Sequence, residues 1–183
     1  MKRFLLAVAM AALTLSLQAC QREADAPPTP FSLTEEALGH YCGMNVLEHP
    51  GPKGQAIVAS FEHPIWFSSA RDAIAFTMLP EEAKDIRGVF VSDMANAPSW
   101  EEPGPDNWVD ASKAFFVIAS EVKGGMGADE AVPFSTEAAA KAFSQQHGGL
   151  VVTLAEIPRN YILGSGSEME TSMSTTTTGR EEM

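Results

Sequence analysis

Phe67-Ser68-Ser69 and Phe134-Ser135-Thr136 are matching stretches that decide the fold, because each opens a predicted helix. Ser68 suits the N-cap of the first helix, whose apolar residues recur at helical spacing until Pro80 ends it. The second helix is stopped by Gly148-Gly149. Each helix leads into a hydrophobic strand, so the chain contains one structural unit twice.

The segments around the two helices have the composition of strands, rich in β-branched and aromatic residues and separated by Pro and Gly turns. The predicted strands of the first unit are 41–47, 55–61 and 86–91, and those of the second are 107–111, 114–120 and 150–154. We therefore predict an α+β fold of two tandem ββαβ domains.

Composition also predicts where the domains begin and end. The two units occupy residues 31–97 and 106–163, joined by a linker dense in Pro and acidic residues at 98–105. Polar, Pro-rich residues 20–30 form a tether, and Ser- and Thr-rich residues 164–183 form a disordered tail.

The N-terminus predicts export and lipidation. Lys2 and Arg3 precede an apolar run, and residues 1–19 have the form of a secretory signal peptide. Leu17-Gln18-Ala19-Cys20 looks like a bacterial lipobox, so Cys20 is the predicted lipidation site. The alternative is a plain secreted protein with an accidental cysteine. The anchor places the protein on the periplasmic side of a membrane, and Gln21 after Cys20 favours the outer membrane.

Charge and motifs exclude several functions. The formal net charge of −12 argues against nucleic acid and anionic lipid as partners. The sequence has no Gly-x-Ser-x-Gly, His-Glu-x-x-His, phosphate-loop or Cys-x-x-Cys motif. We therefore predict that the protein is not an enzyme.

The sulfur residues carry the most specific chemistry. If Cys20 bears a lipid, Cys42 is the only free thiol among the two cysteines, and Met44 lies two residues beyond it. On a strand, both side chains would point to one face, roughly 6.6 Å apart. Soft sulfur ligands favour Cu(I). The alternative is a buried Cys42 that acts as a small hydrophobic residue.

Three further residues are candidates to complete a copper site. Met126 stands in Gly124-Gly125-Met126-Gly127, where the glycines allow a sharp bend that presents the sulfur, although a flexible surface loop would look the same. His40 precedes Cys42 by two residues. Met94 ends a predicted strand and could equally cap the core.

These residues resemble the NosL family, the lipid-anchored copper accessory proteins of nitrous oxide reductase. The resemblance covers the lipobox and the body from Cys42 to Leu163. The matching pieces are Tyr41-Cys42-Gly43-Met44, Gly51-Pro52-Lys53-Gly54-Gln55, Val91-Ser92-Asp93-Met94, Ala114 to Ser120, Met126-Gly127, Pro133-Phe134 and Gly148-Gly149. It implies two ββαβ domains similar to the organomercurial lyase fold.

The resemblance also implies a function. It implies a metallochaperone that binds Cu(I), with Cys42 and Met44 as ligands and Met126 as a further one, and delivers copper to nitrous oxide reductase. The implied partners are that enzyme's maturation complex, an ATP-driven transporter with an extracytoplasmic solenoid subunit. Two alternatives stay open: a thiol enzyme of organomercurial-lyase type, and a lipoprotein scaffold without metal.

Overall fold

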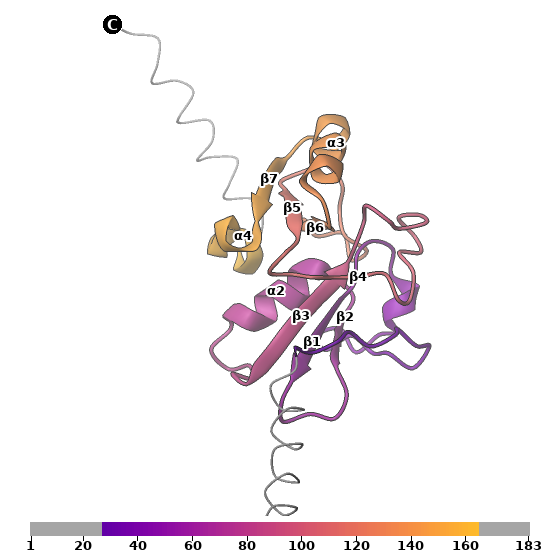
Figure 1. The fold of residues 1–183 in the computed structure, drawn as a ribbon, viewed down its shortest axis with the longest axis vertical. Helices are drawn as coiled ribbons and strands as arrows, with labels where there is room; N and C mark the ends of the chain where they lie inside the picture. Colours follow the sequence, from indigo (N-terminus) through magenta and orange to yellow (C-terminus); the bar gives the residue numbers. More distant parts are fainter. Residues whose placement is uncertain (1–26, 165–183) are drawn as a thin grey trace, which may run out of the picture.

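The computed structural model describes residues 27–164, which form two small antiparallel sheets with helices packed on them (Figure 1). In chain order the elements are η1 (Val46–Glu48), β1 (Gly54–Val58), β2 (Ile65–Phe67), α2 (Ala70–Met78), β3 (Ile86–Ser92), β4 (Trp108–Asp110), β5 (Phe115–Ile118), β6 (Val132–Phe134), α3 (Glu137–His147), β7 (Leu150–Thr153), η2 (Leu154–Glu156) and α4 (Arg159–Leu163). The predicted signal peptide, Cys20, and nearly all of the predicted tail lie outside the described residues, as does the tether up to residue 26.

The first sheet has the strand order β2-β1-β3-β4, and all its neighbouring strands are antiparallel. Helix α2 begins after the N-cap Ser69, whose side chain accepts a hydrogen bond from the backbone N of Asp72. Gly54 lets this helix lie close to β1, because a Cβ at that position would overlap the Cβ of Ala73. The N-cap prediction is wrong by one residue, because Ser69 rather than Ser68 caps the helix. The Ser68 hydroxyl instead lies close to the thiol of Cys42.

The second sheet has the order β6-β5-β7 and carries α3. Thr136 caps α3 by accepting a hydrogen bond from the backbone N of Ala139. Gly148, with φ 69°, ends the helix as predicted. Pro133 lies within β6, and it is tolerated there because β6 is an edge strand.

The predicted α+β fold with two ββαβ units is confirmed: β1, β2, α2 and β3 form one unit, and β5, β6, α3 and β7 form the other. Two strand predictions are wrong, and two strands were missed. Residues 41–47 form a turn and the 3-10 helix η1 rather than a strand. The segment 107–111 supplies β4, which pairs with β3 of the first sheet instead of joining the second unit. The short strands β2 and β6 were not predicted.

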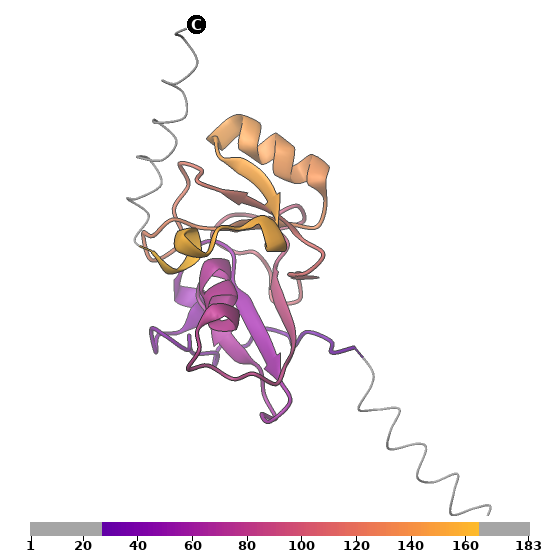
Figure 2. The same ribbon diagram turned by 90° about the vertical axis from the view of Figure 1, so that its left-hand side faces the viewer.

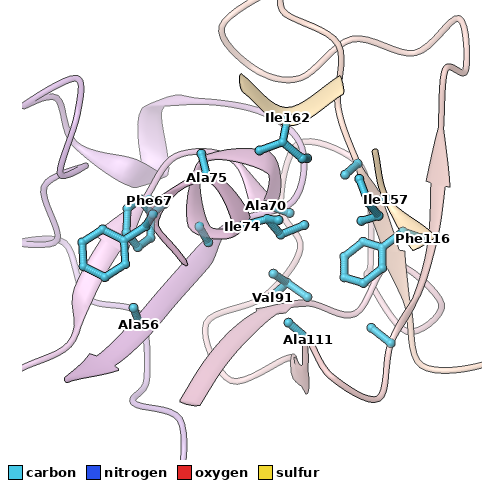
Figure 3. Close-up of a cluster of buried hydrophobic side chains, with 14 of the residues drawn as sticks. Ala56, Phe67, Ala70, Ile74, Ala75, Val91, Ala111, Phe116, Ile157 and Ile162 are labelled. Carbon is cyan, nitrogen blue, oxygen red and sulfur yellow. The ribbon is translucent and has the colours of Figure 1, made fainter. Parts of the chain in front are cut away.

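One cluster of buried hydrophobic side chains joins the two halves. Figure 3 shows Phe116 and Ile157 of the second half facing Val91 and Ile74 of the first. Helix α4 packs against α2, as both ribbon views show (Figures 1 and 2). Arg71 of α2 adds hydrogen bonds to the carbonyl oxygens of residues 129, 162 and 164. These contacts fix the positions of the two halves relative to each other.

Candidate metal centre

Cys42 lies on a tight turn closed by its own backbone. The backbone N of Gly39 donates to the carbonyl oxygen of Met44 at 2.9 Å, and Gly43 N donates to Gly39 O at 2.8 Å. Gly43 has φ 66°, a left-handed conformation that glycine adopts without strain. Cys42 and Met44 both lie on this turn, so the predicted geometry of two side chains on one strand face does not apply.

The Cys42 thiol is half-buried beneath this turn. Its Sγ lies 3.3 Å from the Oγ of Ser68 and 4.0 Å from the carbonyl oxygen of Gly39. A Cβ at Gly39 would lie 2.6 Å from this sulfur and 2.7 Å from the Ser68 hydroxyl. The thiol and hydroxyl thus share a space that only a glycine at position 39 leaves open.

Several large apolar side chains of the segment around Cys42 are exposed to solvent. Met44 is 40% exposed, so its thioether can be reached from outside. The neighbouring large apolar side chains Leu38, Tyr41 and Leu47 are also exposed. A soft metal ion could reach and leave a half-buried thiol and an exposed thioether that lie two residues apart on one turn.

His40 is held on the same turn by Glu82. Its Nε2 lies 3.3 Å from Glu82 Oε1, and Tyr41 donates its hydroxyl to the same oxygen at 3.0 Å. The His40 ring also packs edge-on against Phe67 and Phe76. When Nε2 carries the proton and donates to the carboxylate, Nδ1 keeps a free lone pair, which is the usual arrangement of a metal-binding histidine.

Glu82 also contributes to a raised pKa of its other partner, Tyr41. Partial burial of the phenol, followed by the hydrogen bond and negative charge of Glu82, raises the pKa of Tyr41 above its ordinary value. Tyr41 therefore stays a neutral hydrogen-bond donor and holds the turn against the segment that follows α2.

Met126 is presented on a turn of the second half, and its side chain is 50% exposed. Gly127, with φ 78°, completes the bend that the glycine-rich sequence predicted. The preceding residue, Gly125, packs against the Cβ of His49 and the backbone of Pro50, which follow η1. The structure thus brings the Met126 turn onto the segment that follows the Cys42 turn.

Met94 is placed differently. Its side chain is partly buried and packs against the core cluster of Val117, Val132 and Phe134 in the second half. Its backbone N donates to the carbonyl oxygen of Pro133 at 2.9 Å. Of the two alternatives left open by the sequence, this packing favours a core residue.

Two residues that contact the Cys42 turn were not predicted as part of the site. Ser68 is separated from Cys42 by 26 residues, and Glu82 is separated from Tyr41 by 41. Ser68 carried a sequence signal only for helix capping. Among residues 27–164, no group of three or more His, Cys, Asp or Glu side chains is arranged to hold a metal ion.

Comparison with known proteins identifies the family. The sequence pattern of the NosL family matches residues 30–162. The chain belongs to the NosL family. The copper-binding lipoprotein NosL of Achromobacter cycloclastes is 46% identical over 162 residues, which span 88% of this chain and 82% of that protein. The copper-binding lipoprotein NosL of Stutzerimonas stutzeri is 35% identical over 130 residues, or 71% and 65% of the two chains.

The fold is also that of a NosL protein. The crystal structure of the copper chaperone NosL from Shewanella denitrificans superposes with a TM-score of 0.68 at 33% identity, covering 73% of this chain and 98% of that one. The similarity to organomercurial lyase stays a prediction. Within the part of the chain that the structure describes, no helix has the length and apolar character needed to cross a membrane.

Proposed function

We propose that this protein binds Cu(I) as a cargo ion through the Cys42 thiolate and the Met44 thioether. The observation that carries the proposal is the closed turn, on which a half-buried thiol and an exposed thioether lie two residues apart. A thiolate neutralises the charge of Cu(I), and a thioether adds a second soft ligand. The names of the NosL relatives, copper-binding lipoprotein and copper chaperone, support the same function.

Met126 is the third ligand in this proposal. It comes from the other half of the molecule, on a turn that already rests on the first half. His40 is an additional candidate through Nδ1, because Glu82 lies at its other ring nitrogen. Met94 is the weakest candidate, since its side chain packs in the second core cluster.

The exposure of the two methionines suits delivery rather than storage. Met44 is 40% exposed and Met126 50% exposed, so a donor group of a partner can approach the ion before a resident ligand leaves. We propose that the partner is the maturation complex of nitrous oxide reductase, with its ATP-driven transporter and solenoid subunit. The protein acts as a carrier and not as an enzyme.

A lipid on Cys20 holds this carrier on the periplasmic side of a bacterial membrane, the outer membrane in our proposal. The tether to the described body begins at that residue. Cys20→Ala should leave an unlipidated precursor, whereas wild-type protein should stay in the membrane fraction and incorporate labelled palmitate. Label on the Cys20→Ala protein, or wild-type protein in the soluble fraction, would refute the anchor.

A Cu(I) titration tests the metal site. It is done on protein expressed without residues 1–19 and with Cys20→Ala, so that Cys42 is the only thiol. We expect one Cu(I) per chain in competition with a Cu(I) chelator, and no tight binding after Cys42→Ser. Unchanged binding in Cys42→Ser would overturn the site. A scaffold without metal would show no competition with the chelator in either protein.

A further inference from the structure

The turn that carries Met126 lies directly on the first half of the molecule. A Cβ at Gly125 would overlap the carbonyl oxygen of Pro50 and lie 2.9 Å from the Cβ of His49. The backbone of the turn therefore rests on the backbone of Pro50 and the Cβ of His49. This contact decides where the Met126 side chain is presented.

The turn is also closed on itself. Gly124 N donates to Ala128 O at 2.9 Å, and Gly127 N donates to Gly124 O at 2.8 Å. Lys123 and Asp129 pair across its base through a β-bridge and an ion pair. Because these bonds hold the turn together as one piece, its placement on the first half depends on what fixes its base.

Glu130 fixes that base. Its side chain is 1% exposed, and Oε1 accepts hydrogen bonds from the backbone N of Arg71 and of Ala131, both at 2.9 Å. The first bond joins the second half to the start of α2. Oε2 fills the space beside Gly124, where a Cβ would lie 2.7 Å away. The carboxylate thus touches both the turn and the first half.

Lys53 holds the opposite side of the contact. It is 2% exposed, and its Nζ donates to the carbonyl oxygen of His49, on which the turn rests. Its own backbone is fixed to β3, since Lys53 N donates to Ser92 Oγ and Ser92 N donates to Lys53 O, each at 3.0 Å. Burial lowers the pKa of Lys53 to about 8, and the negative charge of Glu130 opposes this shift.

We infer that Glu130 and Lys53 are positioning residues, which seat the Met126 turn on the first half and so set the contribution of Met126 to Cu(I) binding. The inference rests on the proposed copper function. Well-packed apolar residues can stabilise a fold as well as buried ionisable groups do, so stability alone does not account for two buried ionisable side chains at this contact. Their inferred role is to fix the position of the Met126 turn on the first half.

A double-mutant cycle separates this role from general stabilisation. Cu(I) affinity is measured by chelator competition for wild type, Glu130→Gln, Met126→Leu and the double variant, all with Cys20→Ala. We expect Glu130→Gln to weaken binding by about tenfold, in the range of outer-shell changes at metal sites. With Met126→Leu already present, Glu130→Gln should have no further effect on affinity. Equal loss in both backgrounds would overturn the inference.

The position of the turn can be read without copper. In apo protein with ¹³C-methyl methionine, the Met126 signal, assigned through its absence in Met126→Leu, should shift in Glu130→Gln and in Lys53→Met. Glu137→Gln is the matched control, because Glu137 is exposed on α3 and should leave the signal unmoved. An unshifted Met126 signal in both buried-site variants would refute the positioning role.

The affinity cycle and the Met126 signal test different parts of the inference, so one can fail while the other succeeds. If Met126→Leu binds Cu(I) as wild type does, Met126 is not a ligand, which contradicts its part in the proposed function. The inferred link to copper then fails with it, while a shifted Met126 signal would still support the seating by Glu130 and Lys53.

Discussion

The sulfur of Cys42 lies 3.3 Å from the hydroxyl oxygen of Ser68, although 26 residues separate them in the chain. The contact joins the Cys42 turn to the residue just before the N-cap of α2. Gly39 makes it possible, because a side chain there would occupy the space in which the two groups meet. The position of the thiol therefore depends on a glycine and a serine that carry no metal chemistry of their own.

Gly39→Ala should displace the thiol. The added Cβ would lie 2.6 Å from the sulfur and 2.7 Å from the Ser68 oxygen, well inside the ~3.5–4.0 Å of a favourable contact between carbon atoms. Overpacking of this kind costs about 1–3 kcal/mol. We expect a fall of that size in the free energy of unfolding, measured in urea, and faster reaction of Cys42 with a thiol reagent.

Ser68→Ala provides the control for this prediction. Combined with Gly39→Ala, it removes one of the two atoms that the new methyl group meets, so part of the lost stability should return. Ser68→Ala alone reports the cost of losing the hydroxyl. A Gly39→Ala protein with wild-type stability and thiol reactivity would contradict the geometry of the turn.

Met44→Leu should weaken Cu(I) binding without affecting the fold. Leucine keeps the apolar character of this 40% exposed side chain but lacks the thioether. We expect stability within about 0.5 kcal/mol of wild type, as for other surface changes. Affinity should fall at least tenfold, since even outer-shell changes cost about 10–100-fold. Chelator competition measures the affinity, and X-ray absorption should show fewer copper–sulfur bonds.

Met94→Leu is the matched control, since it removes a thioether from the second core cluster. It should leave affinity and the absorption spectrum unchanged. Weakened binding in Met94→Leu, with unaltered binding in Met44→Leu, would exchange the roles assigned to these two methionines.

Glu82→Ala should release Tyr41 from its partner. Burial of the phenol is the largest cause of the raised Tyr41 pKa, and the Glu82 hydrogen bond and charge add to the shift. Removing the carboxylate should therefore lower the Tyr41 pKa part of the way toward its ordinary value of 10.0. Tyrosinate absorbance measures this shift, because the chain contains only two tyrosines. The transition that disappears in Tyr41→Phe identifies the residue, and identical curves for Glu82→Ala and wild type would contradict the contact.

Helices α2 and α3 could be predicted from the sequence because their signals are local, whereas the short helix α4 was not predicted. The Ser69 and Thr136 caps, Pro80 and Gly148 all lie within a turn of the helix ends they define. The 41–47 segment was misread because apolar residues around glycine resemble a strand, whereas backbone hydrogen bonds at Gly39 close a turn. The β2 and β6 strands are three residues long, too short for a periodic pattern.

The candidate metal ligands could likewise be predicted from the sequence, whereas the residues that hold them in position could not. Cys42, Met44 and Met126 stand out because soft side chains are few and two of them lie in glycine-rich turns. Ser68, Glu82 and Glu130 reach the site or its neighbouring turn through contacts that span 26 to 59 residues. No local pattern specifies contacts between segments so far apart in the sequence.

Glu130 should make stability depend on pH between about 4.5 and 7. Burial is the main cause that raises its folded-state pKa from the ordinary 4.5 to about 7, and the nearby Asp72 carboxylate adds to the shift. Hydrogen bonds from Arg71 N and Ala131 N oppose it. In this window the folded protein keeps a proton that the unfolded chain has released. The contribution of Glu130 to stability is therefore fully present below pH 4.5 and is lost as the pH rises to 7.

Urea unfolding of wild type and Glu130→Gln at pH 4.5, 5.5, 6.5 and 7.5 measures this contribution. The stability difference between the two proteins should change by up to about 1.4 kcal/mol per pH unit in favour of the variant as the pH rises, then level off above 7. Lys53 lies at the same contact, but its lowered pKa of about 8 places its titration above this window. A difference that stays constant from pH 4.5 to 7 would show that Glu130 titrates as an ordinary exposed carboxylate, and its buried position at the base of the Met126 turn would then be wrong.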